Sequence, residues 1–257
     1  MNQKINASLP YVISLKIIRF LRGTDMVEWL LNIFYPHKCM FCGEPINNKE
    51  YYCNKCYYKL PFVEDCRCVV CGREISARET ICLPCRTHKR NFDENHPVFL
   101  YKDEMESALK RYKFTGKMYY YKPFSKFIFD EVQDILGNID YIVYPPVNRK
   151  TFYKRGYNQC ELIARELSAL SGVPYLKNVI KKLRQYNKQS LVKGKDRYKN
   201  VRGAFGIRSK YHDILKDKRI LLIDDVLTTG ATLDECSRML KKHGAFSVIC
   251  TTLCIVR

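Results

Sequence analysis

The sequence lacks three features, and each absence excludes a class of protein. It has no apolar run long enough to cross a bilayer, because the apolar stretch at residues 11–21 is short and contains Lys16 and Arg19. No small-residue cleavage site follows that stretch, so we expect no secretory signal and a cytoplasmic location. No Gly-x4-Gly-Lys-Ser/Thr loop occurs, which excludes a Walker-type nucleotide site. We expect residues 11–21 to form an amphipathic helix packed on the protein body, with a peripheral membrane contact as the alternative.

Acidic residues are scarce relative to basic ones. The 257 residues include 45 Lys and Arg but only 26 Asp and Glu, which gives a formal net charge of +19. Such a surface favours polyanionic partners, namely phosphates, nucleic acid or an acidic membrane; the alternative is a basic surface without a function. Because 46% of the residues are hydrophobic, we expect a globular chain with one large and one small domain.

Cysteine, in contrast, is abundant and regularly spaced. Two copies of the pattern Cys-x-x-Cys, ten residues, Cys-x-x-Cys follow one another, and the residues after each second cysteine also repeat, as Cys42-Gly43 and Cys71-Gly72. This is an internal duplication. The first copy consists of Cys39, Cys42, Cys53 and Cys56, and the second of Cys68, Cys71, Cys82 and Cys85.

The spacing of these cysteines predicts two structural zinc ions. Two Cys-x-x-Cys turns supply the four thiolates of a tetrahedral site, and a module this short needs a metal to fold. We expect two zinc ribbons, each using its own four cysteines, with Gly43 and Gly72 in turns that require a positive φ. A redox Cys-x-x-Cys is the alternative, but that chemistry uses a single exposed motif. Of the other cysteines, we expect Cys66 to be a spare thiol and the rest to be core residues: Cys160, Cys236, Cys250 and Cys254.

The remaining pattern predicts an α/β fold. Apolar runs at 141–144, 220–223 and 247–256 are expected strands. Helical spacing occurs at 105–113, 124–136 and 159–170, and again from Leu233 to Leu240 before Gly244. Strands that alternate with helices indicate a mainly parallel sheet flanked by helices. We therefore expect an N-terminal helical segment at 1–38, a double zinc ribbon at 39–90 and an α/β domain at 97–257.

One segment of this domain has the chemistry of a ligand site. Asp224 and Asp225 follow the expected strand at 220–223, and the Thr- and Gly-rich segment 228–232 then leads into a helix. Ligands of open α/β sheets bind beyond the carboxyl ends of the strands. Backbone N–H groups, hydroxyls and a helix N-terminus suit a phosphate monoester, whereas adjacent carboxylates need cations or hydroxyls. The alternative is an ordinary turn with Thr232 as the helix cap, which leaves the carboxylates and the other hydroxyls unexplained.

Residues 220–232 resemble the signature of type I phosphoribosyltransferases. The resemblance implies that the chain binds phosphoribosyl pyrophosphate, with Asp224 and Asp225 as the catalytic carboxylates on the ribose hydroxyls. It implies a pyrophosphate loop at residues 144–149 that uses Arg149, and magnesium to neutralise the leaving group. The other substrate-binding residues implied are Val226, Leu227, Thr228, Thr229, Gly230, Ala231 and Thr232.

Further motifs make residues 26–257 similar to the ComF (ComFC) family of competence proteins. These motifs are Lys113-Phe-Thr-Gly-Lys117, Arg155-Gly-Tyr-Asn-Gln159, Gln189-Ser-Leu191, Arg197, Asn200-Val201 and Ala204-Phe205. The resemblance implies a role in natural transformation, in which the chain handles incoming single-stranded DNA in the cytoplasm beside a helicase-like ATPase of the uptake machinery. Two alternatives stay open. One is a nucleobase phosphoribosyltransferase of nucleotide salvage, and the other is a non-catalytic, ligand-sensing module that binds DNA or protein.

The stretch 177–210 is strongly basic, with twelve Lys and Arg and a single acidic residue, Asp196. Such a segment can bind a DNA backbone, and Tyr186 and Tyr198 could stack on bases. It could equally be a mobile loop that closes over pyrophosphate, or a solvated charged loop.

Overall fold

The structure is a computed structural model and describes residues 37–46, 51–183 and 201–257. The expectations for residues 1–36, and for the part of the basic stretch at 184–200 that includes Tyr186 and Tyr198, lie outside these residues. Within them, no helix is both long and apolar enough to cross a membrane.

The chain forms two compact units, of which the first ends at Tyr58 and the second is Lys59–Arg257. The described part of the first unit contains the first cysteine repeat and the short helix α3 (Asn54–Tyr57). The second unit contains the second cysteine repeat, with α4 (Leu83–Thr87), and the whole α/β domain. The two cysteine repeats therefore belong to different units.

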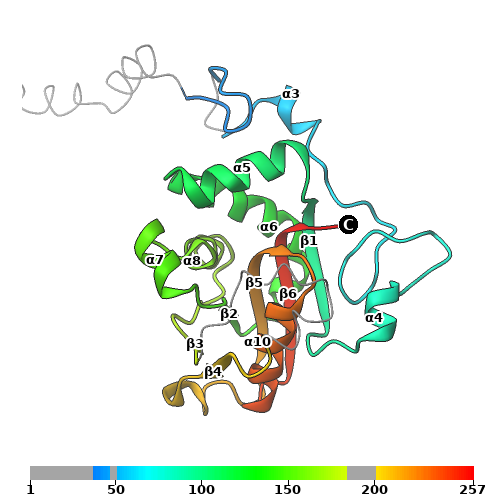
Figure 1. The fold of residues 1–257 in the computed structure, drawn as a ribbon, viewed down its shortest axis with the longest axis vertical. Helices are drawn as coiled ribbons and strands as arrows, with labels where there is room; N and C mark the ends of the chain where they lie inside the picture. Colours follow the sequence, from blue (N-terminus) through cyan, green and yellow to red (C-terminus); the bar gives the residue numbers. More distant parts are fainter. Residues whose placement is uncertain (1–36, 47–50, 184–200) are drawn as a thin grey trace, which may run out of the picture. The chain divides into compact units, whose positions relative to one another are not determined.

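The centre of the second unit is a four-stranded parallel sheet (Figure 1). Its order is β1 (Glu94–Leu100), β6 (Ser247–Ile255), β5 (Arg219–Leu227) and β2 (Tyr141–Val143), and every neighbouring pair is parallel. The two central strands are almost continuously buried, as expected for a parallel sheet that is covered on both faces. The predicted α/β class is confirmed.

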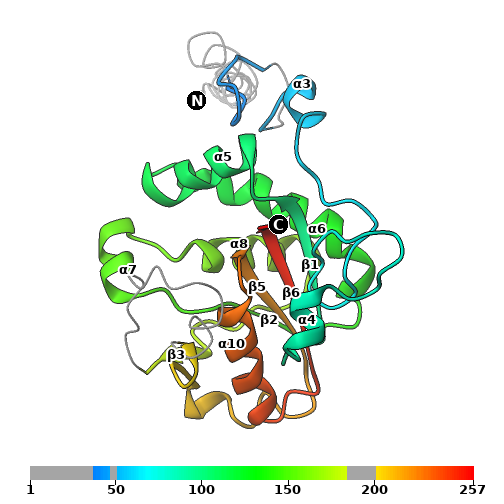
Figure 2. The ribbon, with the colours of Figure 1, turned by 45° about the vertical axis from the view of Figure 1, so that its right-hand side comes forward.

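Helices cover both faces of this sheet. Ile220 and Leu222 of β5 share an apolar cluster with Leu233 and Cys236 of α10 (Ala231–Lys242), which lies in front of the sheet in Figures 1 and 2. The alternate side chains of β5 point to the opposite face. There α6 (Tyr121–Leu136) and α8 (Gln159–Ser171) pack on each other and on the strands.

Shorter elements complete the unit around the edge of the sheet. They are α5 (Asp103–Phe114), a 3-10 helix at Met118–Tyr120, α7 (Arg149–Arg155), the antiparallel pair β3 (Ile180–Lys182) and β4 (Phe205–Ile207), and a 3-10 helix at Ser209–Tyr211. The helices predicted at 105–113, 124–136, 159–170 and 233–240 are all present, and so are the predicted strands. Strand β1 was not predicted, because Pro97 and polar residues interrupt its apolar pattern. Proline is tolerated there because β1 is an edge strand.

The prediction that strand 220–223 ends before the two aspartates is wrong. Strand β5 continues to Leu227, because β6 extends alongside it and supplies backbone partners, with Asp224 opposite Thr252 and Leu227 opposite Ile255. The carboxylates therefore project from a rigid strand near its carboxyl end.

Candidate functional site

Each cysteine repeat folds into a cluster of four thiols. Within each cluster the sulfur atoms lie within 4.8 Å of one another. The Sγ atoms of Cys42 and Cys53 are 3.9 Å apart, and those of Cys71 and Cys82 are 3.5 Å apart. Tetrahedral zinc with Zn–S bonds of about 2.3 Å requires sulfurs about 3.8 Å apart. The two four-cysteine clusters therefore fit two zinc ions, and each repeat uses its own four cysteines.

The glycines after the Cys-x-x-Cys pairs adopt the positive φ that their positions predict. Gly43 and Gly72 have φ values of +79° and +72°, and each donates its N–H to the carbonyl of the first cysteine of its turn, at 2.9 and 2.8 Å. Cys66 is exposed, as predicted for a spare thiol. The four cysteines predicted to be core residues are all buried.

The second cluster is part of the main hydrophobic core. Its four cysteines share a cluster of buried residues with β3, β4, β5, β6 and α10. The first cluster has a small apolar core of its own, built from Cys39, Ile46 and Cys56 with Phe41 and Tyr52. Hydrogen bonding with Cys71 and then with Arg90 lowers the pKa of Cys85 to about 5, against the effect of burial. Such a thiol is readily available to a metal as its thiolate.

Polar contacts join the second cluster to the segment between β5 and α10. Arg73 donates to the carbonyl oxygens of Val256 at 2.5 Å and Thr228 at 3.1 Å, and Arg90 donates to that of Thr229 at 3.1 Å. The main chain and side chain of Asn91 donate to the two carboxylate oxygens of Asp234, in the first turn of α10, at 2.7 and 3.0 Å. These contacts therefore reach the predicted phosphate loop, residues 228–232, and the first turn of the helix after it.

Three side chains from other elements converge on the aspartate pair. Lys113, at the end of α5, places its Nζ 2.9 Å from Oδ1 of Asp225. Gln159, the first residue of α8, donates to Oδ2 of Asp225 at 2.6 Å. The Sγ of Cys160 lies 3.5 Å from Oδ1 of Asp224. The two carboxylates thus occupy a closed polar cluster at the carboxyl end of β5.

This cluster separates the pKa values of the two carboxyl groups. Burial, and then the charge of Asp225, raise the pKa of Asp224 to about 7. Burial acts in the same direction on Asp225, but Lys113 and Gln159 outweigh it and hold the pKa of Asp225 below its usual range. Burial raises the pKa of the Cys160 thiol well above its ordinary value. Near neutral pH, therefore, Asp225 carries the negative charge and Asp224 exchanges its proton readily.

The residues around Asp225 come from two of the ComF-like motifs. Lys113 opens one motif, and Gln159 closes the other. Arg155, at the start of the second motif, hydrogen-bonds the side chain of Gln159, and Tyr112 donates its hydroxyl to the Gln159 carbonyl at 2.9 Å. The sequence prediction of the site does not include these residues, since their motifs indicate only the family. The family resemblance is the sequence signal that could have identified these residues. Only the fold shows that the two motifs meet at Asp225.

The substrate-binding residues predicted at 226–232 differ in their exposure to solvent. Leu227 is buried and Val226 half-buried within β5, whereas Thr228 is exposed and Thr229 half-buried. Gly230, with a φ of +83°, is the N-cap of α10, so Thr232 lies inside the first turn and does not cap the helix. Gly230 itself has no side chain to cap the helix, and the N–H of Ala231 donates to Oγ1 of Thr229 at 3.4 Å. A helix N-terminus that follows such a turn suits an anion.

Arg149 is exposed and begins α7, with Asn148 as the N-cap. Strand β2, which precedes it, pairs in parallel with β5, so Arg149 lies beyond the carboxyl end of β2, at the same edge of the sheet as the aspartates near the carboxyl end of β5. No hydrogen bond or ion pair joins Arg149 to the aspartates in the described part of the chain.

Cys160, Asp224 and Asp225 also lie close enough to hold a metal, with ligand atoms within 4.8 Å of one another. This set does not fit magnesium, because that ion prefers oxygen ligands and Lys113 already neutralises Asp225. A magnesium ion at this site would have to bind mainly through the oxygens of a ligand and water.

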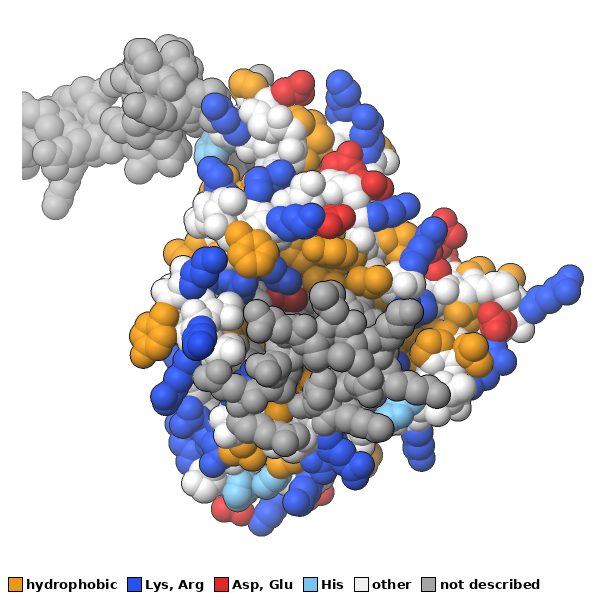
Figure 3. Space-filling model, in the orientation of Figure 1, with side chains coloured by type: hydrophobic (Ala, Val, Ile, Leu, Met, Phe, Trp, Pro, Cys, Tyr) orange, Lys and Arg blue, Asp and Glu red, His pale blue; other side chains and the backbone are white. Residues whose placement is uncertain are grey.

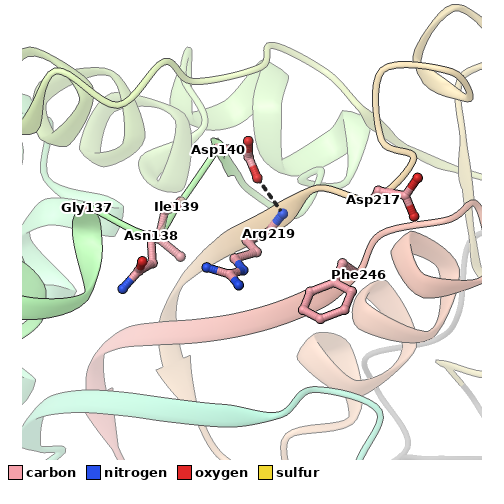
Figure 4. A pocket seen from close by; sticks show the side chains of 7 residues that line it. All are labelled: Gly137, Asn138, Ile139, Asp140, Asp217, Arg219 and Phe246. Carbon is pink, nitrogen blue, oxygen red and sulfur yellow. Dashed lines mark hydrogen bonds between the residues drawn. The ribbon is translucent and has the colours of Figure 1, made fainter.

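A separate pocket of about 480 Å³ lies at the opposite edge of the sheet, before β2 and β5 (Figure 4). The Arg219 side chain points into it, and its backbone N–H donates to Asp140 at 2.8 Å. Because ligands of parallel sheets bind at the carboxyl ends, this pocket is not part of the aspartate site.

Comparison with known families matches two segments of the chain. Residues 30–89 match the double zinc ribbon domain, and residues 169–257 match the phosphoribosyl transferase domain. Among solved structures, the allosteric regulatory enzyme of purine biosynthesis matches 51% of this chain and 25% of its own, with 19% identity and a TM-score of 0.34. A likeness of that strength adds nothing to the sequence matches.

Curated proteins similar to this chain are named for competence or DNA utilization. Competence protein F of Haemophilus influenzae is 27% identical over 63% of this chain and 73% of its own length. Competence protein ComFC of Streptococcus pneumoniae is 30% identical over 59% of this chain and 63% of its own. DNA utilization protein YhgH of Escherichia coli K12 is 27% identical, and the match spans about half of its length, 49%. The resemblance to the ComF (ComFC) competence proteins is therefore confirmed, in a chain that combines a double zinc ribbon with a phosphoribosyl transferase domain.

Proposed function

We propose that this chain is a competence protein that handles incoming single-stranded DNA and binds phosphoribosyl pyrophosphate with magnesium at the carboxyl end of β5. The observation that carries the ligand assignment is the convergence of Lys113 and Gln159 on Asp225, beside a loop that ends in a glycine-capped helix. In this assignment the ribose hydroxyls bind Asp224 and Asp225, and the 5′-phosphate binds the segment 228–232. Arg149 contacts the pyrophosphate.

The state of the carboxylates supports ribose as the ligand. Asp225 is held ionised by Lys113, so it can accept from a ribose hydroxyl. Asp224, with a pKa of about 7, can accept from the other hydroxyl in its ionised form. Two vicinal hydroxyls can thereby donate hydrogen bonds to this pair of largely buried carboxylates.

Basic and aromatic side chains support a role in DNA binding. Lys and Arg gather over α7 and the β3–β4 pair on the face drawn in Figure 3. On α7, Lys150 and Lys154 are exposed beside Phe152 and Tyr153, whose exposed fractions are 44% and 82%. A cationic surface with exposed rings suits single-stranded nucleic acid, because the cations bind phosphates and the rings stack on bases. The described part of the basic stretch 177–210 adds exposed Lys177, Lys181, Arg202, Arg208 and Lys210.

The ligand assignment is tested by calorimetric titration of the full, zinc-loaded chain with phosphoribosyl pyrophosphate and magnesium. We expect Asp224→Asn/Asp225→Asn to weaken binding by roughly 100-fold or more, because each carboxylate makes a charge-assisted hydrogen bond. Asp134→Asn, which neutralises an exposed carboxyl on α6, is the matched control and should bind as the wild type does. No binding by the wild-type chain would refute the assignment.

The role in DNA handling is tested separately, by the fluorescence anisotropy of a labelled single-stranded oligonucleotide at several salt concentrations. Reversal of two charges on α7, Lys150→Glu/Lys154→Glu, should remove two phosphate contacts. The negative slope of log affinity against log salt should then become less steep by about 1.4. The control Lys122→Glu/Lys126→Glu reverses two exposed charges on α6. An equal effect of both pairs would leave net charge, and not α7, as the cause.

The cellular role requires a transformation assay in the organism of origin. Loss of transformation in both the gene deletion and the Asp224→Ala/Asp225→Ala strain would assign the ligand site to DNA uptake, beside the helicase-like ATPase. Turnover of phosphoribosyl pyrophosphate with a panel of nucleobases would instead favour nucleotide salvage. Binding without turnover would favour a sensing module.

A further inference from the structure

The second cysteine repeat has two arginines that the first repeat lacks. Arg73 follows Gly72, whereas Glu44 follows Gly43 at the same place in the first repeat. Arg90 takes the place that Pro61 occupies when the two repeats are superposed in sequence. The first repeat forms its cluster without arginine at these positions. Arg90 hydrogen-bonds Cys85 within its own ribbon, but both arginines also reach outside the ribbon.

Both arginines bind the predicted phosphate loop through its carbonyl groups. Arg73 donates to Thr228 at 3.1 Å, and Arg90 donates to Thr229 at 3.1 Å. A peptide group is planar and trans, so its N–H points away from its carbonyl oxygen. With the carbonyls of Thr228 and Thr229 held on the ribbon side, the N–H groups of Thr229 and Gly230 point to the opposite side of the loop. An array of N–H groups of this kind binds anions.

The arginines are themselves held by a ribbon that is firmly attached to the domain. A Cβ on Gly72 would lie 2.2 Å from Cδ of Pro97 and 2.7 Å from the Asn95 carbonyl oxygen, so the ribbon turn and β1 are in direct backbone contact. Asn95 donates to the Cys71 carbonyl at 3.0 Å. Arg73 also donates to the Val256 carbonyl at 2.5 Å, which joins the loop to the end of β6.

We propose that Arg73 and Arg90 are positioning residues that hold residues 228–230 in the anion-binding conformation. The second cysteine cluster is then a structural part of the ligand site, and zinc bound there is coupled to ligand bound at the loop. This inference rests on the proposed binding of phosphoribosyl pyrophosphate. It goes further by assigning the phosphate end of the ligand to a loop that the second ribbon orients.

The first test compares two ligands on the full, zinc-loaded chain by calorimetric titration. Arg73→Met and Arg90→Met should each weaken phosphoribosyl pyrophosphate binding roughly tenfold, the effect of losing a hydrogen bond from a charged donor. Binding of magnesium pyrophosphate alone should not change, because that group lies away from the loop. Arg73→Lys should restore part of the affinity, since an ammonium can replace one of the two contacts. The matched control is Arg86→Met, because the Arg86 guanidinium contacts only Ile81 and Glu79 of the same ribbon among the contacts described.

The outcomes separate this inference from the proposed function. If the wild-type chain does not bind phosphoribosyl pyrophosphate, the proposed function fails and the inference fails with it. If the wild type binds, and Arg73→Met and Arg90→Met bind equally well, the proposed function stands and the inference is overturned. An equal loss of affinity for pyrophosphate would also overturn it, because the effect would not be specific to the phosphate loop.

A second test uses the reciprocity of binding linkage. In a Cys39→Ser/Cys42→Ser background, only the second cluster retains its four ligands. Saturating phosphoribosyl pyrophosphate should slow zinc release to a colorimetric chelator from this chain, and the added Arg73→Met/Arg90→Met changes should abolish that protection. In the opposite background, Cys68→Ser/Cys71→Ser, the ligand should not alter zinc release from the first cluster. Equal release with and without ligand in the first background would refute the coupling.

Discussion

Replacement of Asp224 by asparagine should make the stability of the protein, relative to the wild type, increase as the pH rises through neutrality, while it weakens ligand binding. The pKa of Asp224 is about 7 in the folded chain, against 3.8 for an unperturbed aspartate. Because the folded state binds this proton more tightly than the unfolded state, wild-type stability falls as the pH rises from about 4 to 7. At 1.36 kcal/mol per pH unit, the loss is at most about 4 kcal/mol, and about 2 kcal/mol of it falls between pH 5.5 and 8.

The assay is urea unfolding of the wild type and Asp224→Asn at pH 5.5 and at pH 8, followed by circular dichroism. An asparagine carries no charge, so the stability of the variant relative to the wild type should increase by about 2 kcal/mol between these pH values. Only this difference is interpreted, since any zinc loss at the lower pH affects both chains alike. Asp134→Asn should show no such pH-dependent gain.

A constant difference between Asp224→Asn and the wild type at the two pH values would refute the reasoning. It would mean that Asp224 is ionised throughout and that its neighbours compensate its burial. A confirmed gain would identify a residue whose charge is retained at the expense of stability, as occurs at functional sites.

Two further predictions concern single contacts. Lys113→Met removes the cation from Asp225, so we expect a loss of roughly 3 kcal/mol in the free energy of unfolding. The pKa of Asp225 should also rise in a carboxyl NMR titration. An unchanged pKa would contradict the ion pair. Gly72→Ala places a Cβ 2.2 Å from Pro97, whereas Gly43→Ala meets nothing within 4 Å. In thermal melting, Gly43→Ala should lose approximately 1 kcal/mol of stability from its positive φ alone, and Gly72→Ala should lose much more. Equal losses of stability would contradict the close packing of the second ribbon.

Local patterns were sufficient to predict the fold class and both cysteine clusters. Spacing alone places four thiols together, because a Cys-x-x-Cys turn is a short-range structure, and apolar runs between helical patterns predict a parallel sheet. The end of strand β5 was placed wrongly for the opposite reason. Asp224 has low strand propensity, and it is held in the strand only by its neighbour β6, which is distant in sequence.

The sequence by itself determined the parallel α/β class and the two four-cysteine clusters that fit zinc, and it indicated the segment 220–232 as the place proposed for a phosphorylated ligand. Only the tertiary structure decided which residues complete that place. Lys113 and Gln159 reach Asp225 because α5 ends, and α8 begins, at the same edge of the sheet. Arg73 and Arg90 reach the loop because the second ribbon packs into the core beside α10. These contacts span 66 to 155 residues of chain, and long-range contacts depend on how separate elements pack.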